Sequence, residues 1–117
     1  MLITADSPFL TNVASAANGG AATASSESTN WAGFPATATT NGDRRGLNIT
    51  NQGVWSTASS GFPAWLQVDF NGSKTISEID VFTEQDNYTS PSEPTETMTF
   101  SSYGLTGYEV QYWNGTA

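Results

Sequence analysis

The sequence contains no histidine and no cysteine, and it has only three basic side chains against 11 acidic ones among its 117 residues. Without cysteine the chain can form no disulfide framework, zinc–thiolate site or thiol nucleophile, and without histidine it has no histidine general base. A formal net charge of −8 cannot neutralise a phosphate backbone, which argues against nucleic acid as a partner. The same charge disfavours binding to an anionic membrane surface.

Long hydrophobic runs are also missing. No stretch approaches the ~18 apolar residues that a membrane-spanning helix needs, so we expect no membrane insertion. Residues 1–10 have neither the basic region nor the apolar run of a secretory signal. If the protein is exported, we expect that its signal has been removed, lies on a larger precursor or is of another type.

Small polar residues are abundant instead. Ser, Thr and Asn together make up 40 of the 117 residues, whereas charged residues make up only 12%, about half of the usual ~25%. The aromatic content of 12%, with four tryptophans, argues against a disordered linker. This composition is typical of a β domain on an extracellular protein, a cell surface or a virion surface.

The apolar residues occur in short, alternating runs separated by Gly, Pro, Asn and Ser, which predicts strands and turns rather than helices. We therefore expect an all-β fold. The clearest predicted strands cover Ala64–Phe70, Thr75–Thr83 and Tyr108–Trp113, and weaker ones are expected near Ala22–Ser26 and Met98–Ser101.

Two long irregular segments, residues 27–55 and 84–97, lie between the predicted strands. The second contains Pro91 and Pro94 and cannot be a central strand. Loops of this length in a compact domain are usually functional or disordered. The aromatic and carboxamide side chains within them favour function.

The last predicted strand runs directly into Asn114-Gly115, a strong hairpin signal, shortly before the sequence stops. Three interpretations stay open. The turn is a frayed end, or the folding unit continues beyond these residues, or Tyr108–Trp113 is an open sheet edge that pairs with another chain.

A series of short motifs follows one order from Asn12 to the end of the sequence. They are Asn12-Val13-Ala14, Ala22-Thr23-Ala24-Ser25-Ser26, Phe34-Pro35-Ala36, Asn41-Gly42-Asp43, Trp55, Trp65-Leu66-Gln67-Val68-Asp69-Phe70, the apolar positions Ile76, Ile79 and Val81, and Tyr108-Glu109-Val110-Gln111-Tyr112-Trp113-Asn114-Gly115. The set resembles the discoidin or coagulation factor 5/8 type C domain, which overlaps with the galactose-binding-like carbohydrate-binding modules of family 32.

The resemblance implies an eight-stranded jelly-roll β-sandwich whose long loops at one end bind ligand. Residues 12–117 would form this domain, and residues 1–11 an N-terminal extension. Family members usually continue past the Trp-Asn-Gly turn with further closing strands, so the resemblance also implies that these strands lie outside the 117 residues.

Many members of that family hold a structural calcium ion in the loop that matches Ala38 to Gly46. The resemblance therefore implies a Ca2+ site with side-chain oxygens from Asn41 and Asp43 and carbonyl oxygens from Ala38 and Gly46, the ligand types that calcium prefers. The family's hydroxyl ligand is not at its usual place, and its C-terminal glutamate ligand has no counterpart in the sequence. The alternative is that Asn41-Gly42-Asp43 forms only a tight turn.

Sugars are bound by flat aromatic faces and by planar amide, carboxylate or guanidinium groups. The predicted ligand-binding residues of these types are Trp31, Arg44, Arg45, Asn87 and Tyr88. Trp31 has the alternative role of a loop anchor, and the two arginines that of solvated or ion-paired residues. Trp55 and Trp65 match family positions that are mostly core, so we expect them to pack internally.

No catalytic residue is predicted. The sequence has no G-x-S-x-G elbow, P-loop or G-x-G-x-x-G motif, and Glu93 and Glu96 lack the apolar surroundings that would raise a pKa for glycosidase chemistry. The leading hypothesis is a non-catalytic carbohydrate-binding module of a larger extracellular or virion-surface protein, with a glycan or glycoconjugate as its ligand. The alternative is a structural unit that forms a homo-oligomer, or binds a tethered partner domain, through the Tyr108–Trp113 edge.

Overall fold

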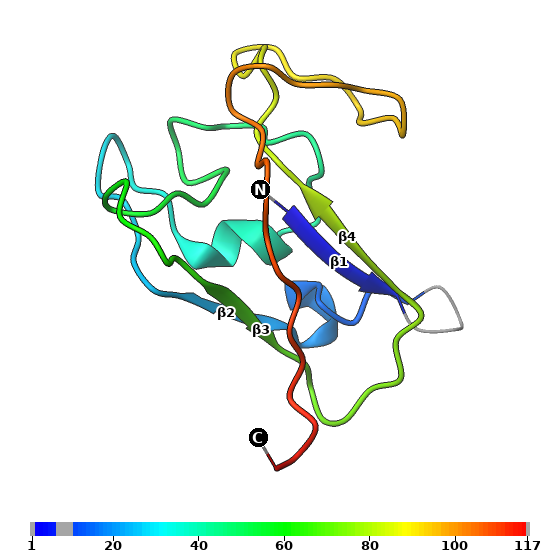
Figure 1. The fold of residues 1–117 in the computed structure, drawn as a ribbon. Helices are drawn as coiled ribbons and strands as arrows, with labels where there is room; N and C mark the ends of the chain where they lie inside the picture. Colours follow the sequence, from blue (N-terminus) through cyan, green and yellow to red (C-terminus); the bar gives the residue numbers. More distant parts are fainter. Residues whose placement is uncertain (1, 7–10, 117) are drawn as a thin grey trace.

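The computed structural model describes residues 2–6 and 11–116 (Figure 1). Within them the chain forms short strands and two 3-10 helical turns, joined by long loops, so the fold is all-β. In chain order the elements are β1 (Leu2–Asp6), η1 (Ala16–Asn18), β2 (Ala21–Ala24), η2 (Ala36–Thr40), β3 (Leu66–Asp69) and β4 (Glu78–Phe82).

The strands form two small antiparallel sheets. β1 pairs with β4, and β2 pairs with β3, so each sheet joins segments far apart in the sequence. Leu66 and Val68 of β3 are half-buried while Gln67 is exposed, which confirms the predicted alternation. β2 and β4 lie within or beside the expected strand regions. The eight-stranded jelly roll stays a prediction, because the described residues form only these two sheets.

β1 lies in the region expected to be an N-terminal extension. Leu2 and Ala5 are each only 2% exposed, and Thr4 Oγ1 donates to Asp80 Oδ2 at 3.1 Å across the sheet. Residues 2–6 are therefore part of the packed fold. Their five-residue run carries little periodicity by itself, and its partner β4 is more than seventy residues away in the sequence. The rest of the expected extension, apart from Thr11, lies outside the described residues.

The short helix η2 lies between the two sheets and contacts both β2 and β1 (Figure 1). Four of its five residues are buried. Thr39 is fully buried, and its hydroxyl donates to the carbonyl of Ala36 at 2.7 Å. This bond satisfies a polar group that would otherwise be costly to bury.

The apolar core is built mainly from small side chains. The buried hydrophobic residues are Leu2, Ala5, Val13, Ala14, Phe34, Ala36, Ala38 and Val54. Half of them are alanines, which remove little apolar area from water. Partly buried Val68, Phe70 and Ile76 extend the core around Ala5, Val13 and Ala14. The loops on either side of η2 therefore depend strongly on their own hydrogen bonds.

Two predicted strands are not strands in the structure. Neither segment forms strand-to-strand hydrogen bonds with another part of the described chain, at Met98–Ser101 or at Tyr108–Trp113. Tyr108, Val110 and Tyr112 are 56–82% exposed. The final segment runs from the loop-rich end of the molecule to the opposite end (Figure 1). Alternation alone does not make a strand, because a strand needs a hydrogen-bonding neighbour.

The two tryptophans expected in the core differ. Trp55 is half-buried and donates its indole N–H to the Ser26 carbonyl at 3.0 Å, which fits a packing role. Trp65 is 53% exposed, so its expected core position is wrong. Trp65 immediately precedes β3, where successive side chains point to opposite faces, so it points away from the face that holds half-buried Leu66.

Replacing Thr39 with valine keeps the shape of the side chain but removes the hydroxyl that donates to Ala36. We expect the free energy of unfolding to fall by about 1 kcal/mol, the usual net contribution of one hydrogen bond. Chemical denaturation monitored by tryptophan fluorescence measures this change. Thr40→Val is the matched control, because the distance from Thr40 Oγ1 to the Thr37 carbonyl is 3.4 Å and the bond is weak. Equal losses in the two variants would contradict the role given to Thr39.

Candidate functional site

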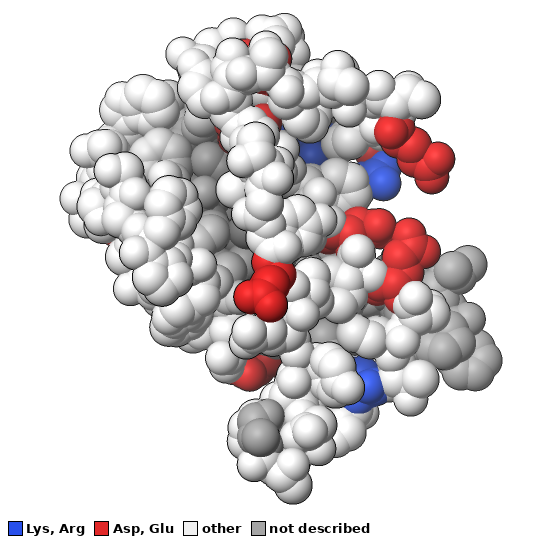
Figure 2. All heavy atoms as spheres, in the orientation of Figure 1, with Lys and Arg blue, Asp and Glu red and all other residues white. Residues whose placement is uncertain are grey.

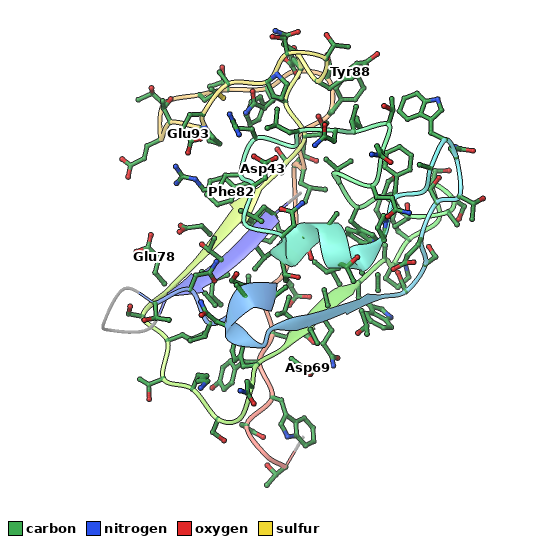
Figure 3. All side chains as sticks on the ribbon, turned by 180° about the vertical axis from the view of Figure 1, so that it is seen from behind. Asp43, Asp69, Glu78, Phe82, Tyr88 and Glu93 are labelled. Atoms are coloured by element: carbon green, nitrogen blue, oxygen red, sulfur yellow. The ribbon has the colours of Figure 1, made fainter. Side chains whose placement is uncertain are left out.

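Two of the predicted functional loops lie together at one end of the molecule. Figure 3 shows Asp43 and Phe82 near the base of this end, with Tyr88 and Glu93 above them in the loop formed by residues 84–97. Glu78 and Asp69 lie away from it. An ion pair between Arg44 and Glu93 connects the loop 41–47 to the loop 84–97. The third predicted region, around Trp31, is a separate turn.

The Trp31 turn covers residues 28–34. The backbone N–H of Phe34 donates to the Ser28 carbonyl at 2.9 Å, and that of Gly33 donates to the Asn30 carbonyl at 2.8 Å, so the turn is closed at its base. Trp31 has a φ of 51°, in the left-handed region that few non-glycine residues adopt. Its side chain is 64% exposed. The turn therefore holds a large aromatic side chain in solvent.

Two shallow hollows, of about 320 and 300 Å³, meet at Trp31 and Phe34. The two ring centroids are 5.7 Å apart and the ring planes are inclined by 39°. The polar lining includes Asn30, Glu27 and Gln52. Gln52 donates from Nε2 to the Ala32 carbonyl at 3.0 Å, which braces the turn. The Asn30 side-chain amide has no hydrogen-bond partner among residues 2–6 and 11–116, so it is available to a ligand.

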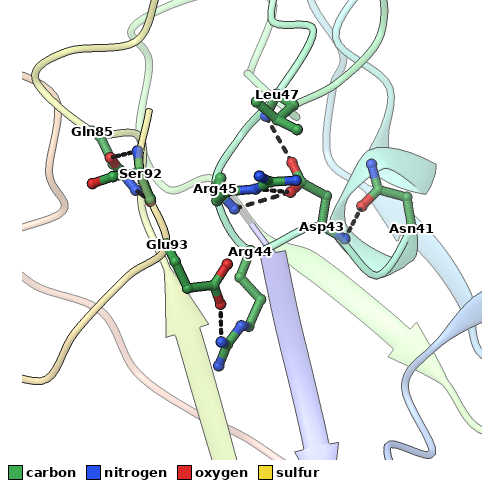
Figure 4. Close-up of polar contacts among 8 residues, drawn as sticks. All are labelled: Asn41, Asp43, Arg44, Arg45, Leu47, Gln85, Ser92 and Glu93. Atoms are coloured by element: carbon green, nitrogen blue, oxygen red, sulfur yellow. Dashed lines mark hydrogen bonds and ion pairs between the residues drawn. The ribbon is translucent and has the colours of Figure 1, made fainter. Parts of the chain in front are cut away.

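The predicted calcium loop is held by its own side chains (Figure 4). Asn41 Oδ1 accepts from the N–H of Asp43 at 2.8 Å. Asp43 Oδ2 accepts from the N–H of Leu47 at 2.7 Å, and its Oδ1 accepts from the backbone N–H and the Nε of Arg45. Burial pushes the pKa of Asp43 upward, but these hydrogen bonds and the charge of Arg45 outweigh it and leave the pKa below its ordinary value. Asn41 and Asp43 thus shape the loop.

Both predicted ligand-binding arginines are ion-paired. Arg44 forms a salt bridge with Glu93 and lies over the ring of Phe82, with 5.5 Å from Cζ to the ring centroid. Arg45 pairs with Asp43 at 3.1 Å. This is the structural role that the sequence left open beside the ligand-binding one.

The loop 84–97 is closed by a reciprocal pair of hydrogen bonds. Gln85 is 5% exposed; its Nε2 donates to the Ser92 carbonyl at 2.7 Å, and its Oε1 accepts from the Ser92 N–H at 3.0 Å. Asn87, a predicted ligand-binding residue, donates from Nδ2 to the Ser90 carbonyl. Tyr88 packs edge-on against Tyr103, with ring centroids 5.5 Å apart. Both predicted residues therefore have contacts within this loop region.

The structure does not gather the five predicted ligand-binding residues into one site. Arg44 and Arg45 lie on the loop joined to 84–97, which carries Asn87 and Tyr88. Within the described chain, the ring contact of Trp31 is with Phe34, and no hydrogen bond or ion pair joins it to the other four. The sequence places all five in loops, but it does not indicate which loops meet.

Glu84 is a feature that the sequence did not single out as a ligand. Both of its carboxylate oxygens are buried and accept no hydrogen bond from any described residue. A Cβ atom built on Gly46 would lie 3.2 Å from Glu84 Oε2 and 3.5 Å from Oε1, so the carboxylate faces the bare backbone of Gly46. Burial raises the pKa of Glu84, and the positive charge of the amino terminus lowers it to a lesser extent.

The contacts of Glu84 and Asp43 bear on whether the loop suits calcium. The described residues contain no group of three acidic side chains arranged to hold a metal ion, so backbone carbonyls would have to supply much of the coordination. Asp43 has the guanidinium of Arg45 against it, which opposes a second cation there. The carboxylate of Glu84 beside Gly46 accepts no hydrogen bond from a described residue, but the positive charge of the amino terminus already acts on it.

The charge distribution is uneven over the face drawn in Figure 2. Acidic side chains are spread over the middle and right of this face, the few basic side chains lie right of its centre, and the left part carries almost no charge. The three basic side chains of the sequence are Arg44, Arg45 and Lys74, and the first two are neutralised by carboxylates. The surface therefore offers little attraction to an anionic ligand.

Asp86 gives a test of how the loop 84–97 is anchored. Its carboxylate accepts hydrogen bonds from the N–H groups of Ser101 and Ser102, and these bonds hold its pKa below the ordinary value of 3.8. A lowered folded-state pKa stabilises the fold above the unfolded pKa, and this contribution is lost as pH falls toward the folded pKa. Because Asp86→Asn lacks this carboxylate, we expect the stability of the variant to fall less than that of the wild type as the pH drops below about 4.

Thermal unfolding of the wild type and Asp86→Asn at a series of acidic pH values measures this effect. Glu96→Gln is the control, because that carboxylate is exposed in the same loop. A pH profile of Asp86→Asn that is parallel to that of the wild type would contradict the anchoring role.

The comparisons with known proteins give one match. The model of the F5/F8 type C family described as "NedA-like, galactose-binding domain" matches residues 38–117. This range includes η2 from its middle onward and the loops 41–47 and 84–97, and the Trp31 turn precedes it. No curated protein and no solved structure matches the chain. Within the described residues, no helix has the length and apolar character to cross a membrane. The match covers more than half of the chain, which therefore belongs to the F5/F8 type C family of galactose-binding-like domains.

Proposed function

We propose that the chain is a non-catalytic carbohydrate-binding module and that it binds glycans at the hollows beside Trp31 and Phe34. The exposed indole of Trp31, held out by a closed turn, is the observation that carries the proposal. Membership of a galactose-binding-like family supports it. We further propose that the whole domain is a jelly-roll sandwich within a larger extracellular, cell-surface or virion-surface protein.

The chemistry of the hollows suits a neutral sugar. The C–H face of a pyranose ring packs against an indole, and the inclined ring of Phe34 gives a second apolar wall. The amide of Asn30 and the second carboxylate oxygen of Glu27 can pair with hydroxyl groups, since Glu27 uses only Oε1 to accept from the Ala36 N–H. With Glu27 nearby and both arginines engaged elsewhere, sialylated or sulfated glycans are disfavoured.

A hollow this open buries only part of a sugar, so a single site binds weakly. Weak sites become useful when they are repeated or tethered, because the second contact forms at a high effective concentration. We therefore propose that avidity, supplied by further copies or by attached domains, determines retention on a glycan-coated surface.

We also propose that the loop from Ala38 to Gly46 takes a structural calcium ion, as the family resemblance implies. Carbonyl oxygens of Ala38 and Gly46 are the proposed backbone ligands. Asn41 and Asp43 would act on the ion mainly by holding the loop in shape, given their internal hydrogen bonds. The ion would supply positive charge that fixes the loop, with no part in any reaction.

Glycan binding is tested by replacing Trp31 with asparagine. Asparagine tolerates a positive φ better than most residues, so the turn should keep its shape while the aromatic face is lost. We expect affinity for neutral glycans on an array to fall about ten-fold or more, equivalent to roughly 1.4 kcal/mol. Trp65→Asn is the matched control, because Trp65 is also exposed, at 53%, but belongs to neither proposed binding surface. Equal binding by wild type and Trp31→Asn would overturn this site.

A second candidate function is assembly through the segment Tyr108–Trp113. Its aromatic and apolar side chains are exposed, and it pairs with no strand of the described chain. An extended segment with free backbone groups can add to the sheet edge of another copy or of a tethered partner domain.

Val110→Pro tests the assembly function, because proline removes a backbone N–H and prevents strand pairing. We expect a concentration-dependent oligomer of the wild type, measured by light scattering after size exclusion, to be lost in Val110→Pro and kept in Val110→Thr. A wild type that stays monomeric at high concentration would contradict self-assembly through this segment.

A further inference from the structure

Glu27 lies at the base of the turn that carries Trp31. It precedes Ser28, whose backbone pairs with that of Phe34, and it lines the same hollow as the indole. Its Oε1 accepts from the N–H of Ala36, the first residue of η2, at 2.7 Å. Because this bond ties one carboxylate oxygen to a buried residue, the carboxylate is held at the edge of the hollow rather than left to move freely.

The basic side chains of the protein do not neutralise this carboxylate. Arg44 and Arg45 are paired with carboxylates of the loops 84–97 and 41–47. Lys74 is exposed in the connection between β3 and β4 and forms no ion pair with a described residue. The positive charge of the amino terminus acts on Glu84. Within the described chain Glu27 therefore offers the hollow a negative charge without an ion-pair partner.

The indole in the same hollow also suits a cation. Trp31 is 64% exposed, so a ligand can reach its ring. The π face of an indole attracts an ammonium group, and tryptophan does so more strongly than the other aromatic side chains. A carboxylate and an indole that line one hollow thus favour the same kind of group. The formal net charge of −8 adds a field that draws cations rather than anions to the surface.

We propose that Glu27 sets the charge preference of the glycan site, so that a sugar with a free amino group binds more tightly than the same sugar without it. The inference rests on the proposed function, because the sugar ring still packs against Trp31 and its hydroxyls still pair with Asn30. The protonated amine adds an ion pair with the free oxygen of Glu27 and a contact with the indole. A neutral sugar makes the ring and hydroxyl contacts alone.

The experiment uses two matched sets of sugars on one array. One set is galactose, N-acetylgalactosamine and galactosamine, and the other is glucose, N-acetylglucosamine and glucosamine. Within a set the sugars differ only in the group on the second ring carbon. We expect the free amine to bind about five-fold more tightly than its neutral partners, the combined effect of an exposed cation–π contact and an exposed ion pair. The preference should weaken at high salt and at a pH that deprotonates the amine.

Glu27→Gln separates the charge from the fold. Glutamine keeps an oxygen that can accept from the Ala36 N–H, and its amide can still pair with a sugar hydroxyl. We expect this variant to bind the amino sugar and its neutral partners equally, with a neutral-sugar affinity and a melting temperature close to those of the wild type. Glu96→Gln is the matched control, because it makes the same charge change at an exposed carboxylate in the loop 84–97. It should keep the five-fold preference of the wild type, predicted from the same two contacts.

The outcomes distinguish this inference from the proposed function. If the wild type binds neutral and amino sugars equally, or if Glu27→Gln keeps the preference, the role given to Glu27 is wrong and the glycan site stands. An amino-sugar preference that survives in Trp31→Asn places the amine elsewhere and also overturns the inference. If the wild type binds no glycan on the array, both proposals fail.

Discussion

The burial of η2 between the two sheets is the constraint on which the rest of the structure depends. Each sheet has only two strands, and neither forms a stable layer alone. η2 contacts both, and its buried Thr39 is satisfied within the helix. The Trp31 turn enters this helix through Pro35, and the loop 41–47 leaves it at Asn41. The same buried turn therefore positions both candidate sites.

The scarcity of basic residues gives the few ion pairs a strong influence on the loops. Arg45 helps to fold its own loop around Asp43, and Arg44 ties that loop to Glu93 on the neighbouring one. These roles leave no arginine for the Trp31 hollows, where uncharged and apolar groups predominate. A chain with so few free cations offers little attraction to anionic ligands, which supports the neutral glycan of the proposed function.

The parts of the fold that the sequence predicts are those decided by local pattern. Alternation predicted a strand over Ala64–Phe70, of which Leu66–Asp69 forms β3, and the polar composition around Trp31 predicted a loop. β1 was not predicted, because its partner β4 is remote in the sequence. The ion pair between Arg44 and Glu93, 49 residues apart in the sequence, and the burial of the Glu84 carboxylate depend on which loops meet in space. Tyr108–Trp113 shows the converse: the pattern was present, but no described strand lies beside it.

The backbone of Trp31 has a consequence for how the domain balances stability against recognition. A left-handed conformation at a bulky residue costs roughly 1–3 kcal/mol, and glycine would adopt it freely. An aromatic residue at this position therefore lowers the stability of a fold whose small core is rich in alanine. The protein carries that ring in spite of the folding cost, and backbone strain of this kind is concentrated at functional sites, which supports the proposed glycan site.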